Sequence, residues 1–344
     1  MADNLANSLR EYLKSVQGRV VTLRDLRMEL KIDPNSSAWE GVRVQMLRFA
    51  NNPKERLVVP SGKNDGVYKV IVQVNPVRVF VPGRERRPVF NLMFPQDAQR
   101  DIEIDIADKI VIREGDLITL GGVKSKGKTT LCLQFAGANI DKRPVLMGNE
   151  YTVAVDGRYE PAPRFFNRLE KMSEWIEWVD SEGNDKFTLL PVREDYAEHI
   201  VRDKINIIDW INMDAGALYD ISRVLENIKA QLGRGVAIIA LQKSEGAGNP
   251  RGGQFVRDFS DVEILLDGYG KGDDDILMTI KGVKEKKSPV VNKTFAYTII
   301  NEGTQLYNFR EVVECRACRG SGFTKGGKCE ECNGRKYIDK DEGF

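Results

Sequence analysis

The feature that most constrains the fold of this chain is an unbroken phosphate-binding loop pattern, G-x-x-x-x-G-K-[ST], at residues 122–129. An apolar run at 116–121 precedes it and predicts a buried strand, and the run at 130–136 predicts a helix. Glycines at both ends of such a loop let the backbone curl around phosphate oxygens, so that amide N–H groups and a helix N-terminus face the anion. The alternative is a surface loop rich in Gly and Lys that matches by accident.

Two side chains of this loop have chemistry that suits a nucleotide. Lys128 is expected to reach the terminal phosphates, and Thr129 is expected to offer its hydroxyl to Mg²⁺. The pattern therefore predicts an α/β domain that binds ATP and Mg²⁺ through Gly122, Val123, Lys124, Ser125, Lys126, Gly127, Lys128, Thr129 and Thr130.

Three further apolar runs each end in a polar residue. The runs 144–149, 205–208 and 235–241 are followed by Glu150, Asp209 and Gln242. In a parallel sheet these side chains would emerge at one edge, beside the phosphate loop. A phosphate loop needs a group that holds Mg²⁺ and a group that prepares the attacking water, and the two carboxylates are candidates for these tasks.

With these residues in this order, the chain resembles the RecA-like ATPases, the group that holds RecA recombinases and DnaB-type hexameric helicases, over residues 104–309. The resemblance implies a core in which a parallel sheet is flanked by helices. It also implies that Glu150 polarises the attacking water, that Asp209 binds Mg²⁺ through water as part of the nucleotide site, and that Gln242 relays the state of the γ-phosphate to the loop after it.

That loop, residues 243–254, is polar and rich in Gly. It resembles the second DNA-binding loop of the family, which implies contacts of Lys243, Arg251 and Arg257 with single-stranded DNA in a ring channel or filament axis. The alternative is a mobile segment that covers the nucleotide. The stretch at 210–216 would hold the equivalent first loop, but it carries no basic residue.

The residues after an expected strand at 275–283 include Lys284 and Lys286. RecA-like proteins have a basic-x-basic pair here that reaches the ATP of the adjacent subunit, so the resemblance implies that both lysines act in catalysis across an interface. A ring or filament with head-to-tail contacts would then be required. The alternative is a solvated charged hairpin.

The first 74 residues show three helical patterns followed by two short alternating runs, and Thr22 with Asp25 forms a capping-box pattern. This arrangement resembles a winged helix-turn-helix, whose third helix enters the major groove of duplex DNA. The alternative is a module that binds protein. The resemblance implies DNA contacts by Arg43, Gln45 and Arg48 on the third helix and by Lys63 and Lys69 on the wing. Residues 75–103, with several prolines and an Arg cluster, are expected to be a linker without an assigned role.

Near the C-terminus, the tail at 310–344 contains two CxxC pairs formed by Cys315, Cys318, Cys329 and Cys332. Four thiolates at this spacing predict a tetrahedral Zn²⁺ site. The CxxCxGxG unit resembles the zinc-binding repeat of DnaJ-type chaperones, with a single zinc module. Its role is either purely structural, or it docks protein or nucleic acid.

Composition adds little on function. The net charge is +1, although residues 1–72 hold 12 Lys and Arg against 8 Asp and Glu. No run approaches the roughly 20 apolar residues of a membrane span, so a soluble cytoplasmic protein is expected. The sequence thus predicts a Mg²⁺-dependent ATPase that forms a ring or filament and translocates on or remodels DNA. Alternatives are a strand-pairing recombinase filament, or a nucleotide-switched regulator or loader that binds replication or mobile-element proteins of a phage, plasmid or transposon.

Overall fold

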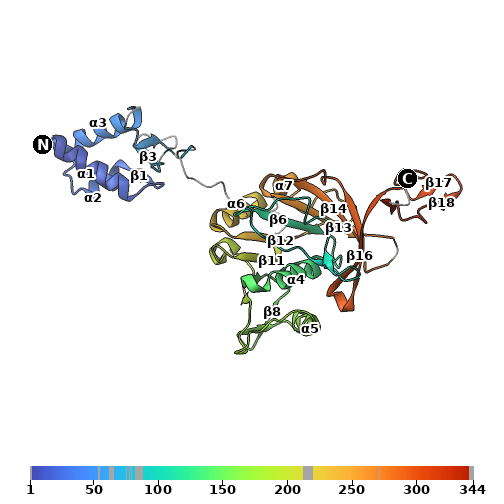
Figure 1. The fold of residues 1–344 in the computed structure, drawn as a ribbon. Coiled ribbons are helices and arrows are strands. Elements are labelled where there is room, and N and C mark those ends of the chain that lie inside the picture. The colour runs from blue at the N-terminus through green and yellow to red at the C-terminus, as the bar shows by residue number, and fades with distance from the viewer. Residues whose placement is uncertain are drawn as a thin grey trace. The chain divides into compact units, whose positions relative to one another are not determined.

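The computed structural model describes residues 2–52, 55–61, 66–74, 76, 78, 80–81, 88–211, 220–270 and 272–340. The chain divides into two compact units, Met1–Arg84 and Glu85–Phe344 (Figure 1). Each unit has a hydrophobic core of its own.

The N-terminal unit alternates helices with short strands, which form a sheet in the order β1-β3-β2. Thr22 N–H donates to Asp25 Oδ2 (2.8 Å) and Asp25 N–H donates to Thr22 Oγ1 (3.1 Å), so the capping box expected at the second helix is present. Its elements are α1 (Ala2–Ser15), β1 (Val20–Thr22), α2 (Leu23–Glu29), α3 (Ser37–Asn51), β2 (Val58–Pro60) and β3 (Val67–Val70).

The third helix, α3, has one buried and one exposed face. Its apolar face packs into the core of the unit through Val42, Met46, Phe49 and Ala50. The opposite face exposes Arg43 and Arg48 together with Val44 and Leu47, while Gln45 is half-buried. Lys69 is exposed on β3. Lys63 lies outside the described residues.

The C-terminal unit is built on a twelve-stranded sheet within the described residues, in the order β10-β7-β11-β12-β6-β13-β14-β15-β16-β4-β5 with β19 paired to β16. In this spatial order, neighbouring strands from β10 through β7, β11, β12 and β6 to β13 are parallel. Neighbouring strands from β13 through β14 and β15 to β16 are antiparallel. The strands are β4 (Gln96–Asp97), β5 (Ile102–Glu103), β6 (Leu117–Gly122), β7 (Val145–Met147), β10 (Thr188–Leu190), β11 (Ile205–Ile211), β12 (Val236–Gln242), β13 (Val262–Gly268), β14 (Asp275–Val283), β15 (Thr294–Ile300), β16 (Gln305–Glu314) and β19 (Tyr337–Asp339).

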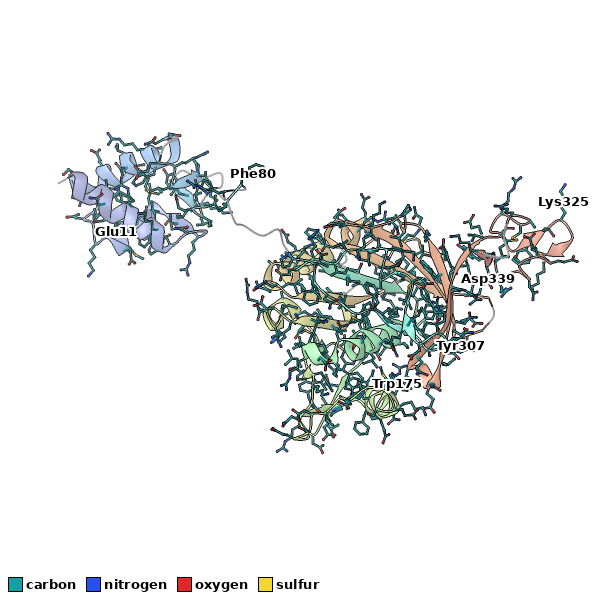
Figure 2. The ribbon with its side chains drawn as sticks, viewed as in Figure 1. Glu11, Phe80, Trp175, Tyr307, Lys325 and Asp339 are labelled. Atoms are coloured by element: carbon teal, nitrogen blue, oxygen red, sulfur yellow. The ribbon has the colours of Figure 1, made fainter. Side chains whose placement is uncertain are left out.

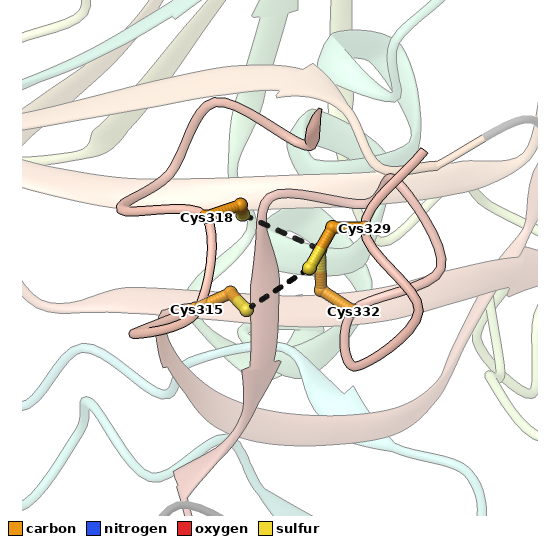
Figure 3. Close-up of side chains that lie close together, drawn as sticks. All are labelled: Cys315, Cys318, Cys329 and Cys332. Carbon is orange, nitrogen blue, oxygen red and sulfur yellow. Dashed lines mark hydrogen bonds between the residues drawn. The ribbon is translucent and has the colours of Figure 1, made fainter. Parts of the chain in front are cut away.

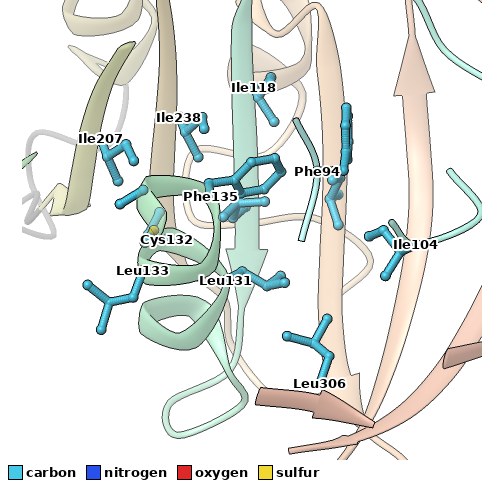
Figure 4. Packing of buried hydrophobic residues seen from close by; sticks show 14 of the residues in the cluster. Phe94, Ile104, Ile118, Leu131, Cys132, Leu133, Phe135, Ile207, Ile238 and Leu306 are labelled. Carbon is cyan, nitrogen blue, oxygen red and sulfur yellow. The ribbon is translucent and has the colours of Figure 1, made fainter. Parts of the chain in front are cut away.

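Helices cover both faces of this sheet. Along β12, Val236, Ile238 and Ala240 pack with α4, whereas Ala237, Ile239 and Leu241 pack with α6 and α7 on the other face. Figure 4 shows Phe135 of α4 turned toward the strands that carry Ile118 and Ile238. The helices are α4 (Lys128–Ala138), α6 (Ile221–Gln231) and α7 (Gln254–Phe259), with short 3₁₀ turns η1 (Ile140–Lys142), η2 (Tyr196–His199) and η4 (Asn301–Gly303).

The parallel part confirms the predicted α/β class, a parallel sheet flanked by helices. One expectation is adjusted: the segment expected to be a linker up to residue 103 is structured from residue 88. Leu92 and Phe94 are buried in the main core, and β4 and β5 join the sheet. Their apolar side chains are spaced irregularly among prolines, which hid this packing from the sequence pattern.

Two insertions extend from the sheet. Between β7 and β11 lie the hairpin β8 (Thr152–Val155) and β9 (Arg158–Pro161) and the helix α5 (Pro163–Met172). After β16, the chain forms the small hairpin β17 (Phe323–Thr324) and β18 (Gly327–Lys328) before it returns as β19. Among the described residues, no helix has the length and apolar character needed to cross a membrane.

Candidate functional site

The polar residues that follow the apolar runs do meet at one edge of the sheet. Gln242 of β12 pairs in register with Gly122 of β6, and β12 neighbours β11, which carries Asp209. On the other side of β11, β7 leads to Glu150. A Cβ at Gly148 would lie 2.2 Å from the Asp209 carbonyl oxygen, so only glycine lets these two strand ends approach so closely.

The phosphate loop has the backbone that its glycines predicted. Gly127 adopts φ +77° and caps α4, and a Cβ there would lie 2.6 Å from Ile299 Cδ1. Lys128 Nζ donates to the carbonyl oxygens of Gly122 and Val123, both at 2.9 Å. The ammonium group is therefore held within the loop, at the N-terminus of α4.

The carboxylate of Asp209 is the most unusual group at this edge. It is fully buried, and neither of its oxygens has a hydrogen-bond partner among the described residues. Burial raises the pKa of Asp209 to about 6, while the nearby Thr129 hydroxyl acts to lower it. A buried carboxylate without a donor, next to a hydroxyl, suits a hydrated Mg²⁺, so Asp209 and Thr129 fit the expected metal site.

The second carboxylate, Glu150, differs because it is exposed to the cavity. Trp210 Nε1 donates to Glu150 Oε1 at 3.3 Å, and Glu150 N–H donates to the Asp209 carbonyl oxygen at 3.3 Å. Glu150 is thus tied to the neighbouring strand while a carboxylate oxygen stays accessible. This is the arrangement expected of a base that orients a water molecule.

These groups surround one cavity of about 880 Å³. Gln242 and Arg251 share it with the phosphate loop and both carboxylates, and the turn η4 closes one side. Its lining includes Lys124, Ser125, Lys126, Gly127, Lys128, Thr129, Thr130, Glu150, Asp209, Trp210 and Gln242. The volume and the mixture of cations and carboxylates suit a nucleoside triphosphate with its metal.

Four further charged residues that the sequence did not single out line the same cavity: Arg164, Arg168, Asp274 and Glu302. Arg164 and Arg168 lie four residues apart on α5, so both reach one side of that helix. Arg168 acts to lower the pKa of Asp209, as a cation near that carboxylate must. The signal in the sequence was the spacing of the two arginines after Pro163.

The three basic residues after Gln242 that were expected to contact DNA differ in their surroundings. Lys243 is only 3% exposed and pairs with Asp267, and Arg257 Nε pairs with the buried Glu263 at 2.9 Å. Both cations thus have partners within the chain, because a buried charge, Lys243 in one pair and Glu263 in the other, requires one. We therefore do not include Lys243 among the residues that can reach a DNA strand. Arg251 lies at the cavity, which agrees with the alternative that this loop covers the nucleotide.

Lys284 and Lys286 lie at the opposite edge of the sheet from the cavity. Lys284 follows β14, whose last residue pairs with the start of β13, and its Nζ lies 3.0 Å from Asp261 Oδ1. Lys286 is exposed and bridges to Ile110. Neither residue lines the cavity of its own chain.

A second candidate site is the cluster of Cys315, Cys318, Cys329 and Cys332, whose sulfur atoms all lie within 4.8 Å of one another (Figure 3). Two of the Sγ–Sγ distances are 3.8 Å and 3.6 Å. Tetrahedral zinc with Zn–S bonds of about 2.3 Å requires sulfurs about 3.8 Å apart. The buried thiols therefore fit a Zn²⁺ ion, as the spacing predicted.

The buried Asp209 leads to a prediction for stability against pH. Its pKa is raised from 3.8 to about 6, so between these values the unfolded chain releases the proton before the folded chain does. As the pH rises from 3.8 to about 6, this group should lower the free energy of unfolding of the metal-free protein by up to about 3 kcal/mol. Asp209→Asn should remove that fall, which urea unfolding of both proteins at about pH 4 and about pH 7 measures. An identical pH dependence in the two proteins would contradict this assignment.

Comparison with known proteins gives little beyond the geometry. No family model and no curated protein matches the chain. Among solved structures, the chain is similar to one described as the crystal structure of the RadB recombinase, with 15% identity and a TM-score of 0.39, over 55% of this chain and 90% of that one. An identity and a TM-score this low do not support an argument about activity, which depends instead on the geometry of the site.

Proposed function

We propose that this chain is a Mg²⁺-dependent, RecA-like ATPase that acts on DNA. The observation that carries the proposal is the single cavity in which the phosphate loop and the carboxylates of Asp209 and Glu150 meet. Asp209 is buried without a hydrogen-bond partner in the part of the chain that the structure describes, and Glu150 is exposed. A phosphate loop alone would support nucleotide binding. The two carboxylates, one suited to a metal and one to a water molecule, support hydrolysis.

In this proposal, each residue has one task. The loop amides and Lys128 bind the β- and γ-phosphates, and Thr129 and Asp209 hold the metal. When bound there, Mg²⁺ would neutralise charge on the phosphate oxygens. Glu150 orients a water molecule and accepts its proton as the oxygen attacks the γ-phosphorus and the bond to ADP breaks. Gln242, at the end of β12, senses the γ-phosphate.

The location of Lys284 supports the proposal that active sites are completed between subunits of a ring or filament. Because Lys284 and Lys286 lie at the edge opposite their own cavity, any nucleotide that they contact would be bound to another copy. Lys284→Ala should lower hydrolysis by about tenfold or more, as loss of a trans-acting cation does. Mixing it with Lys128→Ala should restore part of the rate, since each variant supplies what the other lacks.

Hydrolysis by the Lys284→Ala mixture, compared with each variant alone, tests this directly. Lys287→Ala is the matched control, because Lys287 is exposed in the same turn and carries the same charge. If Lys284→Ala turns over ATP at the wild-type rate, or if mixing restores nothing, the lysine does not act across an interface.

DNA as the partner is supported by the N-terminal unit. Its order of helix, strand, helix, helix and hairpin resembles that of a winged helix, and α3 exposes Arg43 and Arg48. Helicase-like translocation leads, and strand pairing by a recombinase-like filament is the alternative within the same class. The exposed Val44 and Leu47 on the same face would equally suit contact with a protein.

A second candidate function, a nucleotide-switched regulator or loader, is favoured by one observation. Lys243 and Arg257, expected to grip DNA in the core, are paired with carboxylates of β13. The N-terminal unit would then be the main DNA reader, and turnover would serve to switch assembly. This version predicts slow hydrolysis that DNA does not accelerate.

Steady-state ATP hydrolysis without nucleic acid, with single-stranded DNA and with duplex separates these functions. The expected result is Mg²⁺-dependent turnover that single-stranded DNA stimulates severalfold and that Lys128→Ala abolishes. Slow turnover unchanged by DNA would favour the regulator. Turnover that survives Lys128→Ala would show that the cavity is not an ATPase site.

A further inference from the structure

The turn between β13 and β14, which the structure describes at residues 269, 270 and 272–274, borders the nucleotide cavity. Lys126 of the phosphate loop donates from Nζ to the Asp273 carbonyl oxygen at 2.7 Å, and Asp274 lines the cavity itself. Ile299 N–H donates to the Asp274 carbonyl oxygen at 2.8 Å, which ties the turn to a second wall of the cavity. The position of this turn therefore sets the position of Lys126.

The other side of the same turn touches the four-cysteine module, residues 315–339. Tyr269, only 4% exposed, lies between two guanidinium groups, with Arg335 at 5.6 Å and Arg310 at 5.9 Å from its ring centroid. The stem of Arg335 also lies against Gly270, where a Cβ would be 3.3 Å from Arg335 Cγ. Arg335 therefore packs on two consecutive residues of the turn.

Arg335 is held in place by the backbone of the cysteine knuckle. Its N–H donates to the Cys332 carbonyl oxygen at 2.9 Å, and its Nε donates to the same oxygen at 3.3 Å. The module is joined to the sheet by β19, which pairs with β16, and by Arg310 Nε, which lies 2.7 Å from Asp339 Oδ1. Figure 2 shows Asp339 on the side toward the sheet and Lys325 at the outer end of the module.

We propose that the four-cysteine module braces the nucleotide cavity through Arg335, which packs on Tyr269 and Gly270 and so fixes the turn that positions Lys126. This inference rests on the proposed nucleotide site. The module has few apolar contacts, so bound metal fixes the Cys332 turn. Without that turn, ordering Arg335 and the phosphate loop costs conformational entropy that nucleotide binding must offset. Arg335 is thus a positioning residue that makes metal content and nucleotide affinity interdependent.

The test uses the full chain and two measurements, the zinc content and the affinity for a fluorescent ATP analogue with Mg²⁺. Arg335→Ala should keep one zinc per chain and bind the analogue roughly twofold to fivefold more weakly, as loss of one cation–π contact made by an exposed guanidinium predicts. Lys325→Ala, which removes the same charge from the exposed tip of the module, should bind like the wild type. Arg335→Lys should recover part of the loss.

Tyr269→Leu removes the aromatic partner of Arg335 and leaves the cysteine knuckle unchanged. It should retain zinc and weaken binding at least as much, because it removes the contact with Arg310 as well as that with Arg335. Combining it with Arg335→Ala should add little beyond Tyr269→Leu alone. If Arg335→Ala loses its metal, the affinity of Tyr269→Leu for the ATP analogue tests the inference instead. Wild-type affinity in Tyr269→Leu with zinc retained would overturn the inference. A wild-type chain that binds no analogue would instead overturn the proposed nucleotide site.

Discussion

Replacing Glu150 with Gln is expected to lower ATP hydrolysis by about 100-fold or more, the range over which a general base contributes to catalysis. Gln keeps the size of the side chain and can still accept the hydrogen bond from Trp210 Nε1. It cannot take a proton from the attacking water. Nucleotide affinity should change by less than about twofold, because phosphate binding depends on Lys128 and the loop amides rather than on Glu150.

The matched control for this variant is Glu302→Gln. Glu302 belongs to η4 and lines the same cavity, so the change of charge and of size is identical. Turnover and the affinity for the ATP analogue are measured on both proteins. An equal loss of turnover in the two variants would attribute the effect to the overall charge of the cavity. A Glu150→Gln protein that keeps more than half of the wild-type rate would exclude Glu150 as the base.

The meeting of polar residues at one edge of the sheet could be predicted, because it follows from the local sequence pattern and from the parallel topology. Apolar runs of strand length, each ending in a polar residue, are readable in the sequence, and parallel strands carry their C-terminal ends to the same edge. Asp209, Gln242 and Glu150 therefore met as expected. The structure adds their difference in burial, which sets Asp209 apart as the group suited to metal.

Contacts between distant parts of the chain could not be predicted. Lys243 pairs with Asp267 because the lysine is buried, and Arg257 pairs with Glu263 because that carboxylate is buried. The composition of the loop gives no sign of either contact. Likewise, β1 has three residues and exists because it pairs with β3 far along the chain. A strand of that length has no periodicity of its own that a pattern could reveal.

The placement of α5 shows the same limit at the site itself. The stretch between Glu150 and Asp209 contains no motif that the sequence analysis assigned, yet it brings Arg164 and Arg168 to the cavity. Basic residues four apart on a helix are common on solvated surfaces. This pair differs from such residues because the turn η4 lies opposite α5, with Gly303 against Arg168. Only the folded chain brings these two segments together.

Removal of metal from the four-cysteine module, by chelation or by Cys332→Ser, is expected to unfold residues 315–336 while the large sheet stays folded. The apolar cluster of this module consists of the four cysteines, Ile338 and Val313, and β17 and β18 have two residues each. So small a core cannot offset the entropy of ordering the segment, so metal binding supplies its folding free energy. Amide exchange at Gly322 and Cys329 should accelerate by at least about 100-fold.

The sheet should survive because its strands do not depend on the module. β16 has ten residues and pairs along most of its length with β15, so thermal unfolding of the sheet should shift by only a few degrees, whereas exchange in the module changes completely. Cys132→Ser is the control, since Cys132 is the fifth cysteine and is a buried residue of α4 in the main core. It should destabilise the core slightly and leave the zinc content unchanged. Slow exchange at Gly322 after verified loss of metal would mean that the knuckle folds through protein contacts alone, and zinc would then have no structural part in it.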